Sequence, residues 1–331
     1  MILLHELGHY LFARLFKVGI KEFAVGMGPK ILSGVSKKTG IRYSLRLLPI
    51  GGFVTMLGED EVSDSPDALC NKPVLQRIVI CAAGSAFNII TGVVLVFAVI
   101  MLSPALGSNV IAEFTENAVS CDYGLVAGDR VVAIGSDRTP TLRNIVYEIG
   151  HLGDEAADIT VIRDGERKVL EDVRFGQEEN DGVSFGVMDF KVKTEEKNIL
   201  TVIKHSFYTS VLTVKMIWES LIDLITGRYG FDALSGPVGV TTTVGNAAKQ
   251  GIDSLLYLSS VLAMNLGVFN LLPIPALDGG RLFFQLVELI FRKSIPQRLE
   301  GMVHFAGIVL LMILMLIVTY QDIIKLITGR L

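Results

Sequence analysis

Three long runs without a charged residue constrain this chain more than any other feature of its sequence. The runs are Ile78–Leu102, Ser254–Leu277 and Gly301–Gln321, within 331 residues of which 50% are hydrophobic and 19% charged. An α-helix rises about 1.5 Å per residue, so each run can cross a hydrocarbon layer of about 30 Å. The sequence therefore predicts a polytopic α-helical membrane protein and argues against a disordered chain or a simple soluble domain.

The second of these runs is interrupted near its end by Pro273 and Pro275. Proline removes a backbone hydrogen bond and clashes with the preceding turn, so the helix must open there. Non-helical backbone at membrane depth is tolerated where it lines a cavity or is covered by protein. We therefore expect a functional site beside this broken helix end.

The N-terminal segment MILLHELGHYLFA is apolar but short, with only 13 residues before Arg14. As a helix it covers about 20 Å, which is too little to span a membrane alone. A secretory signal would begin with basic residues and continue with an unbroken apolar core and a cleavage site, and this segment has none of them. We interpret it as the second half of a transmembrane helix whose first half is absent from this sequence.

Charge placement predicts the orientation of the spans. Residues 14–46 contain eight Lys and Arg side chains against the single acidic Glu22, and basic segments stay in the cytoplasm. Residues 103–190 carry 17 acidic and 7 basic side chains, as expected of a domain on the opposite side. The formal net charge of the chain is −4, which gives no electrostatic basis for a nucleic-acid partner.

Between the first and second runs the pattern changes to short β-rich segments that start near Asn109. The pair Asp164-Gly165 is a hairpin signal, and Tyr123–Ser136 (YGLVAGDRVVAIGS) resembles a PDZ domain of the bacterial, circularly permuted type. A β-sandwich spacer is the alternative interpretation. Beyond it, residues 199–226 have the spacing of an amphipathic helix that packs on the bundle or lies on the membrane surface, and Gly227–Gly251 predicts an irregular connection.

The sequence His5-Glu6-Leu7-Gly8-His9 is an H-E-x-x-H motif. Two histidines four residues apart lie on one face of a helix, where both rings can bind one zinc ion, and the glutamate can act as a general base. Ionisable side chains inside an apolar membrane segment are costly and usually mark a functional site. We expect His5 and His9 to bind Zn²⁺ and Glu6 to be catalytic, the alternative being a set of satisfied polar core residues.

A catalytic zinc site needs a third protein ligand and leaves its fourth position to water. The candidate is Asp278, in the segment Asn270–Gly280 (NLLPIPALDGG) at the broken end of the second run. On its own, an aspartate before Gly-Gly is more often a turn residue or a helix cap. The three cysteines, Cys70, Cys81 and Cys121, are spaced for neither a disulfide framework nor a zinc ribbon.

Taken together, H-E-x-x-H at His5–His9 and N-x-x-P-x-P-x-x-D-G at Asn270–Gly279 resemble the two signatures of the site-2 proteases, intramembrane zinc metalloproteases, specifically the RseP type with a PDZ domain. The resemblance covers nearly the whole chain. It implies that His5, His9 and Asp278 bind zinc, that Glu6 is the catalytic base and that Asn270 lies near the substrate. It also likens residues 49–56 to a re-entrant β-loop that pairs with substrate, and residues 84–88 to a G-P-x-x-N stretch with Ser85 in place of proline.

The resemblance further implies an enzyme of the bacterial cytoplasmic membrane that cleaves transmembrane segments of single-pass membrane proteins, such as anti-sigma factors or signal-peptide remnants. Two alternatives stay open: an inert PDZ-bearing membrane adaptor, because the first helix is short, and a metal transporter. The predicted organisation is residues 1–102 with transmembrane helices 1 and 2, residues 103–190 as an extracytoplasmic PDZ-like domain, residues 191–253 as amphipathic helix and connection, and residues 254–331 with helices 3 and 4.

Overall fold

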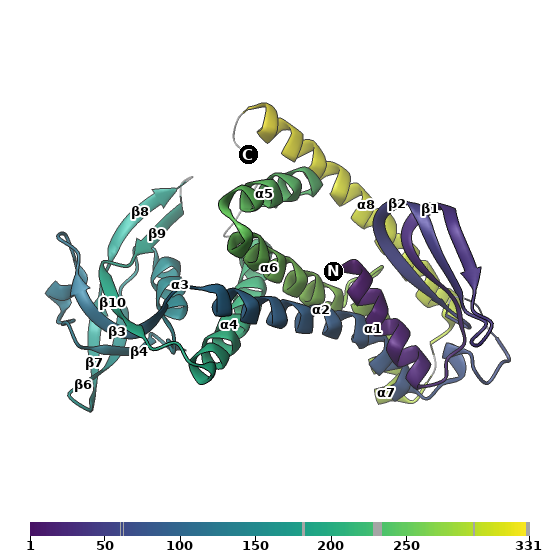
Figure 1. Cartoon of the computed structure of the whole chain (residues 1–331), viewed down its shortest axis with the longest axis horizontal. Helices are drawn as coiled ribbons and strands as arrows, with labels where there is room; N and C mark the ends of the chain where they lie inside the picture. Colours follow the sequence, from purple (N-terminus) through teal and green to yellow (C-terminus); the bar gives the residue numbers. More distant parts are fainter. Residues whose placement is uncertain (60, 62, 181–182, 228–233, 294, 329–331) are drawn as a thin grey trace. The chain divides into compact units, whose positions relative to one another are not determined.

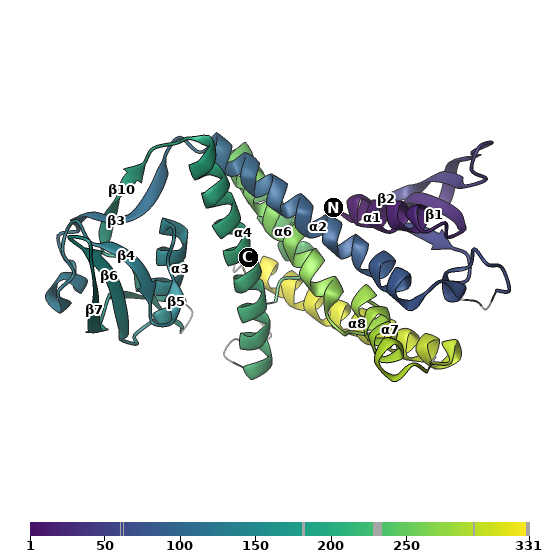
Figure 2. The ribbon, with the colours of Figure 1, turned by 90° about the horizontal axis from the view of Figure 1, so that it is seen from below.

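The computed structural model describes residues 1–59, 61, 63–180, 183–227, 234–293 and 295–328. Its contacts divide the chain into two units, one made of residues 1–95 and 216–331 and the other of residues 96–215. Figures 1 and 2 show the elements of both units in two perpendicular views.

The first unit is built mainly of helices. Its helices are α1 (Ile2–Leu15), most of α2 (Val74–Leu102), the end of α4 (Ile199–Thr226), α5 (Pro237–Gln250), α6 (Ile252–Leu271), α7 (Asp278–Phe291) and α8 (Gln297–Ile327). Among the described residues, α2, α6 and residues Arg298–Ile327 of α8 are long and apolar enough to cross a membrane. These helices confirm the three long spans predicted from the sequence. The second run ends as a helix at Leu271, just before Pro273, rather than at Leu277.

The irregular connection predicted for Gly227–Gly251 is wrong over residues 237–250, which form α5. Proline suits the first turn of a helix, where its missing N–H has no partner to lose, and Pro237 stands there. The buried carboxylate of Asp322 in α8 also accepts a hydrogen bond from the Gly239 N–H at 2.8 Å. That tertiary contact between distant residues cannot be read from the glycine-rich sequence. Residues 228–233 of the predicted connection lie outside the described residues.

Glycines let α1 and α6 approach α2 closely. A Cβ atom on Gly8 of α1 would lie 2.5 Å from the Ala83 carbonyl oxygen, and one on Gly267 of α6 would lie 2.9 Å from that of Ser85. Small residues at such crossings allow helix backbones to pack in contact within a membrane. Helices α2 and α6 accordingly run side by side in both views (Figures 1 and 2). The two motif-bearing helices are thereby held on the same central helix.

Strands β1 (Ile20–Val35) and β2 (Arg42–Met56) form an antiparallel sheet in which both strands bend. As a result, residues 22–25 of β1 pair with residues 42–45 on one side and with residues 52–55 on the other. The segment 52–56 is therefore the outer segment of the sheet, paired along one of its two edges. The predicted β-loop, residues 49–56, is the last part of β2.

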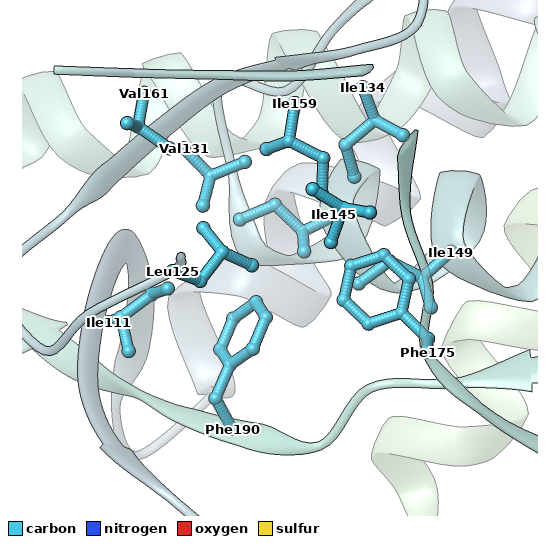
Figure 3. Close-up of a cluster of buried hydrophobic side chains, with 11 residues drawn as sticks. Ile111, Leu125, Val131, Ile134, Ile145, Ile149, Ile159, Val161, Phe175 and Phe190 are labelled. Carbon is cyan, nitrogen blue, oxygen red and sulfur yellow. The ribbon is translucent and has the colours of Figure 1, made fainter. Parts of the chain in front are cut away.

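The second unit is β-rich, as the sequence predicted. Its main sheet has the order β10-β3-β4-β6-β7, with β5 paired to β4, and a separate hairpin joins β8 to β9. Buried aliphatic and aromatic side chains, among them Ile111, Val161 and Phe190, form its core (Figure 3). The elements are β3 (Leu106–Phe114), β4 (Arg130–Ile134), β5 (Asp137–Arg138), α3 (Leu142–Leu152), β6 (Ala157–Arg163), β7 (Glu166–Val173), β8 (Gly176–Asn180), β9 (Val183–Val187) and β10 (Phe190–Glu195).

Two details of this unit bear on the sequence predictions. Asp164 and Gly165 join β6 to β7 with positive φ angles of 54° and 86°, the backbone that a two-residue type I′ hairpin turn requires. Strand β10 pairs with β3 through Glu195, so the sheet continues past the boundary predicted at residue 190. Likeness to a PDZ domain stays a prediction from the sequence.

We expect the Asp189→Asn substitution to destabilise the second unit. The buried Asp189 carboxylate accepts hydrogen bonds from the backbone N–H groups of Val119 and Ser120, both at 2.8 Å, and from the Ser120 hydroxyl at 2.6 Å. An amide turns an N–H₂ group toward one of these donors, and an unsatisfied buried donor costs about 1–3 kcal/mol. Thermal unfolding of the full-length protein measures the loss, with the exposed Asp122→Asn as the control. Equal stability of both variants would contradict this assignment.

Candidate metal centre

Three ionisable side chains from opposite ends of the chain converge within the first unit. The Nε2 atoms of His5 and His9 lie 3.0 and 3.2 Å from Oδ2 of Asp278, and 3.2 Å from each other. Both histidines are 7% exposed. Among the described residues, these three form the group of His, Cys, Asp and Glu side chains that can hold a metal ion.

The donor atoms fit a zinc ion. Imidazole nitrogen and carboxylate oxygen are ordinary zinc ligands at about 2.0–2.2 Å, and tetrahedral ligands at that bond length are about 3.3 Å apart. The observed separations of 3.0–3.2 Å are close to this value. Three protein ligands leave the fourth position open, which is the arrangement of catalytic rather than structural zinc sites.

The local fold aims Asp278 at the histidines rather than at its own helix end. Helix α7 begins at Asp278 itself, with Leu277 as the N-cap residue and no side-chain capping bond, so the cap interpretation does not hold. The preceding turn places Ala276 at a φ of 78°, and the Ala276 N–H donates to Nδ1 of His304 in α8 at 3.0 Å. A left-handed alanine is strained, and the His304 contact holds the turn that delivers Asp278.

Hydrogen bonds to the outer ring nitrogens orient the two histidines. Nδ1 of His9 lies 2.8 Å from the backbone carbonyl oxygen of Ile80, which can only accept. Nδ1 of His9 must therefore carry the proton, which leaves Nε2 with a lone pair for a metal ion. An outer partner of this kind fixes both the tautomer and the ring orientation.

Asn88 has the equivalent position behind His5. Its side-chain amide is fully buried, with Nδ2 3.3 Å from Nδ1 of His5 and Oδ1 without a hydrogen-bond partner among the described residues. If His5 binds metal through Nε2, its Nδ1 is a donor and needs an acceptor. A half-turn of the amide supplies one, because it brings Oδ1 of Asn88 opposite the Nδ1–H group.

Gly84 leaves the room that the two rings occupy. A Cβ atom at this position would collide with Nε2 of His9 and lie 2.7 Å from Cε1 of His5. The two outer residues of the stretch that resembles G-P-x-x-N therefore each have a physical role in this chain: Gly84 makes room for the histidine rings, and Asn88 contacts His5. The sequence around Asn88 does not reveal its histidine partner, which lies 83 residues away.

Glu6 faces the same site from the helix that carries the histidines. Its Oε2 accepts a hydrogen bond from the Val54 backbone N–H at 3.1 Å. A cavity of about 210 Å³ is lined by Glu6, His5, His9, Val54 and Asp278, together with residues of β2, α2 and α7. The H-E-x-x-H segment, the aspartate and the outer segment of the β-sheet therefore border one space.

Asn270, the remaining predicted site residue, lies in the last turn of α6 and is partly buried. It is not among the residues that line the cavity. Sequence reasoning missed Cys81, Glu59 and Arg281, which do line it. Cys81 contacts the Asp278 backbone carbonyl oxygen through its Sγ atom at 3.2 Å, and all three cysteines are free thiols.

Membrane-length helices around an H-E-x-x-H motif define a membrane-embedded metalloprotease. Residues 1–314 match the model of peptidase family M50. A protein of Clostridium acetobutylicum, provisionally named a zinc metalloprotease, is 34% identical over 328 residues, covering 98% of this chain and 94% of its own length. Two relatives named RasP, a regulator of sigma-W protease of Bacillus subtilis and a zinc metalloprotease of Geobacillus kaustophilus, are 30% and 31% identical. Each alignment covers 98% of this chain, together with 96% of the Bacillus subtilis protein and 95% of the Geobacillus kaustophilus protein.

The chain therefore belongs to peptidase family M50, the site-2 protease family. It is a metalloendopeptidase whose cofactor is Zn²⁺, and the three membrane-length apolar helices found among the described residues make it an integral membrane protein.

We expect the Asn88→Leu substitution to weaken zinc binding. Leucine removes the acceptor behind His5, and loss of an outer hydrogen-bond partner typically costs about 10–100-fold in metal affinity. Asn88→Asp keeps an acceptor and should retain zinc better than Asn88→Leu. Zinc retained by the purified protein against increasing chelator concentrations measures this affinity.

The matched control is Thr91→Val, one helical turn further along α2, where the hydroxyl donates to the Phe87 carbonyl oxygen of the same helix at 2.7 Å. Zinc retention in Asn88→Leu equal to that in the Thr91 control would show that Asn88 does not position His5.

Proposed function

We propose that this protein hydrolyses peptide bonds within the membrane-spanning segments of single-pass membrane proteins. The observation that carries the proposal is the convergence of His5, His9 and Asp278 at one point, with Glu6 lining the same cavity. Helix α1 packs on α2 at Gly8, and α7 contacts α2 through Cys81 and Asp278. Helix α2 is long and apolar enough to cross a membrane. Hydrolysis at that depth needs a polar site built from buried ionisable groups, which otherwise are rare in membrane helices.

His5, His9 and Asp278 would hold the zinc ion, which when bound polarises a peptide carbonyl and makes a water molecule more acidic. Glu6 is the general base: its carboxylate takes a proton from the attacking water and passes it to the leaving amine. Asn88 and the Ile80 carbonyl keep the imidazole rings in place during this exchange. No acyl-enzyme is required, because the attacking group is water.

The substrate has to be extended at the cleavage site, since the amides of a helix are paired with one another. The outer segment of β2, residues 52–56, lines the cavity with Phe53, Val54 and Met56 and offers an edge for strand addition. Gly52 also allows close pairing with β1, because a Cβ atom there would lie 2.9 Å from the Ala24 carbonyl oxygen. A peptide paired with this edge would run past the three converging side chains.

Asn270 is proposed to contact the substrate beside the Pro273–Pro275 turn. It occupies the last turn of α6, where the helix stops and backbone groups are no longer paired within it. An amide side chain at such a point can hydrogen-bond an extended peptide through both its oxygen and its nitrogen.

The chain is proposed to lie in the bacterial cytoplasmic membrane, with the β-rich unit outside the cytoplasm. The excess of basic residues between positions 14 and 46 and of acidic residues between 103 and 190 supports this orientation. The β-rich unit would then act as a PDZ-like docking or size-selecting module for substrates already shortened outside the membrane.

Anti-sigma factors and signal-peptide remnants are the proposed substrate classes. The Bacillus subtilis relative is named a regulator of sigma-W protease, which links a protein 30% identical to this one to sigma-factor control. Both classes present a single apolar segment with a short external remainder after an earlier cut.

We expect Glu6→Gln to abolish cleavage while zinc stays bound. Glutamine keeps the size of the side chain and an acceptor for the Val54 N–H, but it cannot take up the water proton. Full-length protein in lipid vesicles is tested with a tagged reporter that has one apolar span, and zinc is measured in the same preparation. Cleavage retained by Glu6→Gln would remove Glu6 from the role of base.

A further inference from the structure

The outer edge of the β-sheet, residues 52–56, is not free in this structure. The N–H groups of Val54 and Met56 donate to side chains outside the sheet rather than to β1, and both residues line the cavity. Each is bound by a carboxylate at 3.1 Å, Val54 by Oε2 of Glu6 and Met56 by Oε2 of Glu59. Alternate N–H groups along one edge are the donors that an added strand would use.

Glu59 is itself tied to the helix that carries Asp278. Its Oε1 atom lies 2.7 Å from Nη1 of Arg281, which is three residues after Asp278 and so on the same face of α7. The Glu59 and Arg281 side chains are 19% and 30% exposed, and both line the 210 Å³ cavity. One carboxylate thus bridges the sheet edge and the metal-site helix.

We propose that Glu6 and Glu59 are placeholders on the substrate-binding edge, and that an incoming extended peptide must displace both carboxylates from Val54 and Met56. The inference rests on the proposed function and assigns a gating role to Glu59 and Arg281. The Glu6 carboxylate then becomes free to transfer a proton only when a peptide strand is bound. The Glu59 carboxylate stays paired with Arg281 after the peptide has displaced it from the Met56 N–H group.

This exchange selects for unwound substrate. A helical segment has its carbonyl oxygens bonded within itself and offers no acceptors for the Val54 and Met56 N–H groups. An extended segment presents carbonyls at alternate residues and can replace both carboxylates. Because hydrogen bonds to charged acceptors are stronger than those to neutral ones, the carboxylates oppose binding until several backbone bonds form together.

The test measures peptide binding to the full-length, zinc-loaded Glu6→Gln protein, which is not expected to cleave. The probe is a synthetic peptide of about 20 apolar residues, with a Pro-Gly pair and a photoreactive benzoylphenylalanine at its centre. Cross-links to residues 52–56 are mapped by mass spectrometry, and the half-saturating peptide concentration is compared with and without Glu59→Ala.

We expect Glu59→Ala to lower the half-saturating concentration about tenfold, since one charged acceptor no longer has to be displaced. Glu59→Gln keeps an acceptor without the charge. Its half-saturating peptide concentration should therefore lie between that of Glu59→Ala and that of the protein with Glu59 intact. Glu61→Ala, an exposed glutamate in the same loop, should leave binding unchanged. The zinc content of each variant shows whether it is folded. If Glu59→Ala does not retain zinc, peptide binding by Glu59→Gln is compared with that of the protein with Glu59 intact instead.

Unchanged or weaker binding by the folded Glu59 variants, with cross-links still on residues 52–56, would overturn the placeholder role and leave the proposed function standing. Absence of cross-links at these residues in every variant would overturn strand addition at this edge and the placeholder role that depends on it, while the cleavage test of Glu6→Gln decides the proposed hydrolysis separately.

Discussion

The meeting of Asp278 with His5 and His9 is the contact on which the rest of this structure depends. An aspartate at the centre of a membrane helix costs about 2.5–3.5 kcal/mol on insertion scales, and here an aspartate gathers with two buried histidines. Their mutual contacts offset part of that cost, and a metal ion held between them would offset more. Other features follow from the need to bring them together: the glycines that let α1 and α6 approach α2, and the turn before α7 that His304 holds.

Helix α7 connects the metal centre to the place where we propose that substrate binds. Asp278 and Arg281 share one of its faces, and Arg281 pairs with Glu59, three residues after the end of β2. Glu6 makes a parallel connection from α1 to the same sheet edge. Both helices that carry proposed metal ligands are therefore bonded to the strand that would hold the peptide. A shift of that strand would therefore move groups next to the metal centre, through the carboxylates of Glu6 and Glu59.

Features that depend on local spacing could be predicted from the sequence. The uncharged runs predicted α2, α6 and α8, Asp164-Gly165 predicted a hairpin, and the spacing of apolar residues predicted α4. The two motifs predicted which side chains would gather, and the structure brings His5, His9 and Asp278 together. Their roles as zinc ligands, like that of Glu6 as the base, stay predictions.

Features that depend on contacts between distant residues could not be predicted. Helix α5 was missed because its glycine-rich start is held by Asp322, 83 residues away. The pairing of Glu59 with Arg281 crosses 222 residues, and no local pattern marks either side chain. Asn88 was noted only as part of a family stretch, because its role depends on which ring nitrogen of His5 it faces.

The most direct test of this zinc ligand set is X-ray absorption at the zinc edge of the full-length protein, compared with Asp278→Ala. Zinc bound by His5, His9 and Asp278 should show two imidazole nitrogens and oxygen ligands at about 2.0–2.2 Å and no sulfur, and the variant should lose an oxygen ligand or the metal. A sulfur ligand, which Cys81 could supply, or a zinc environment unchanged by Asp278→Ala would contradict it.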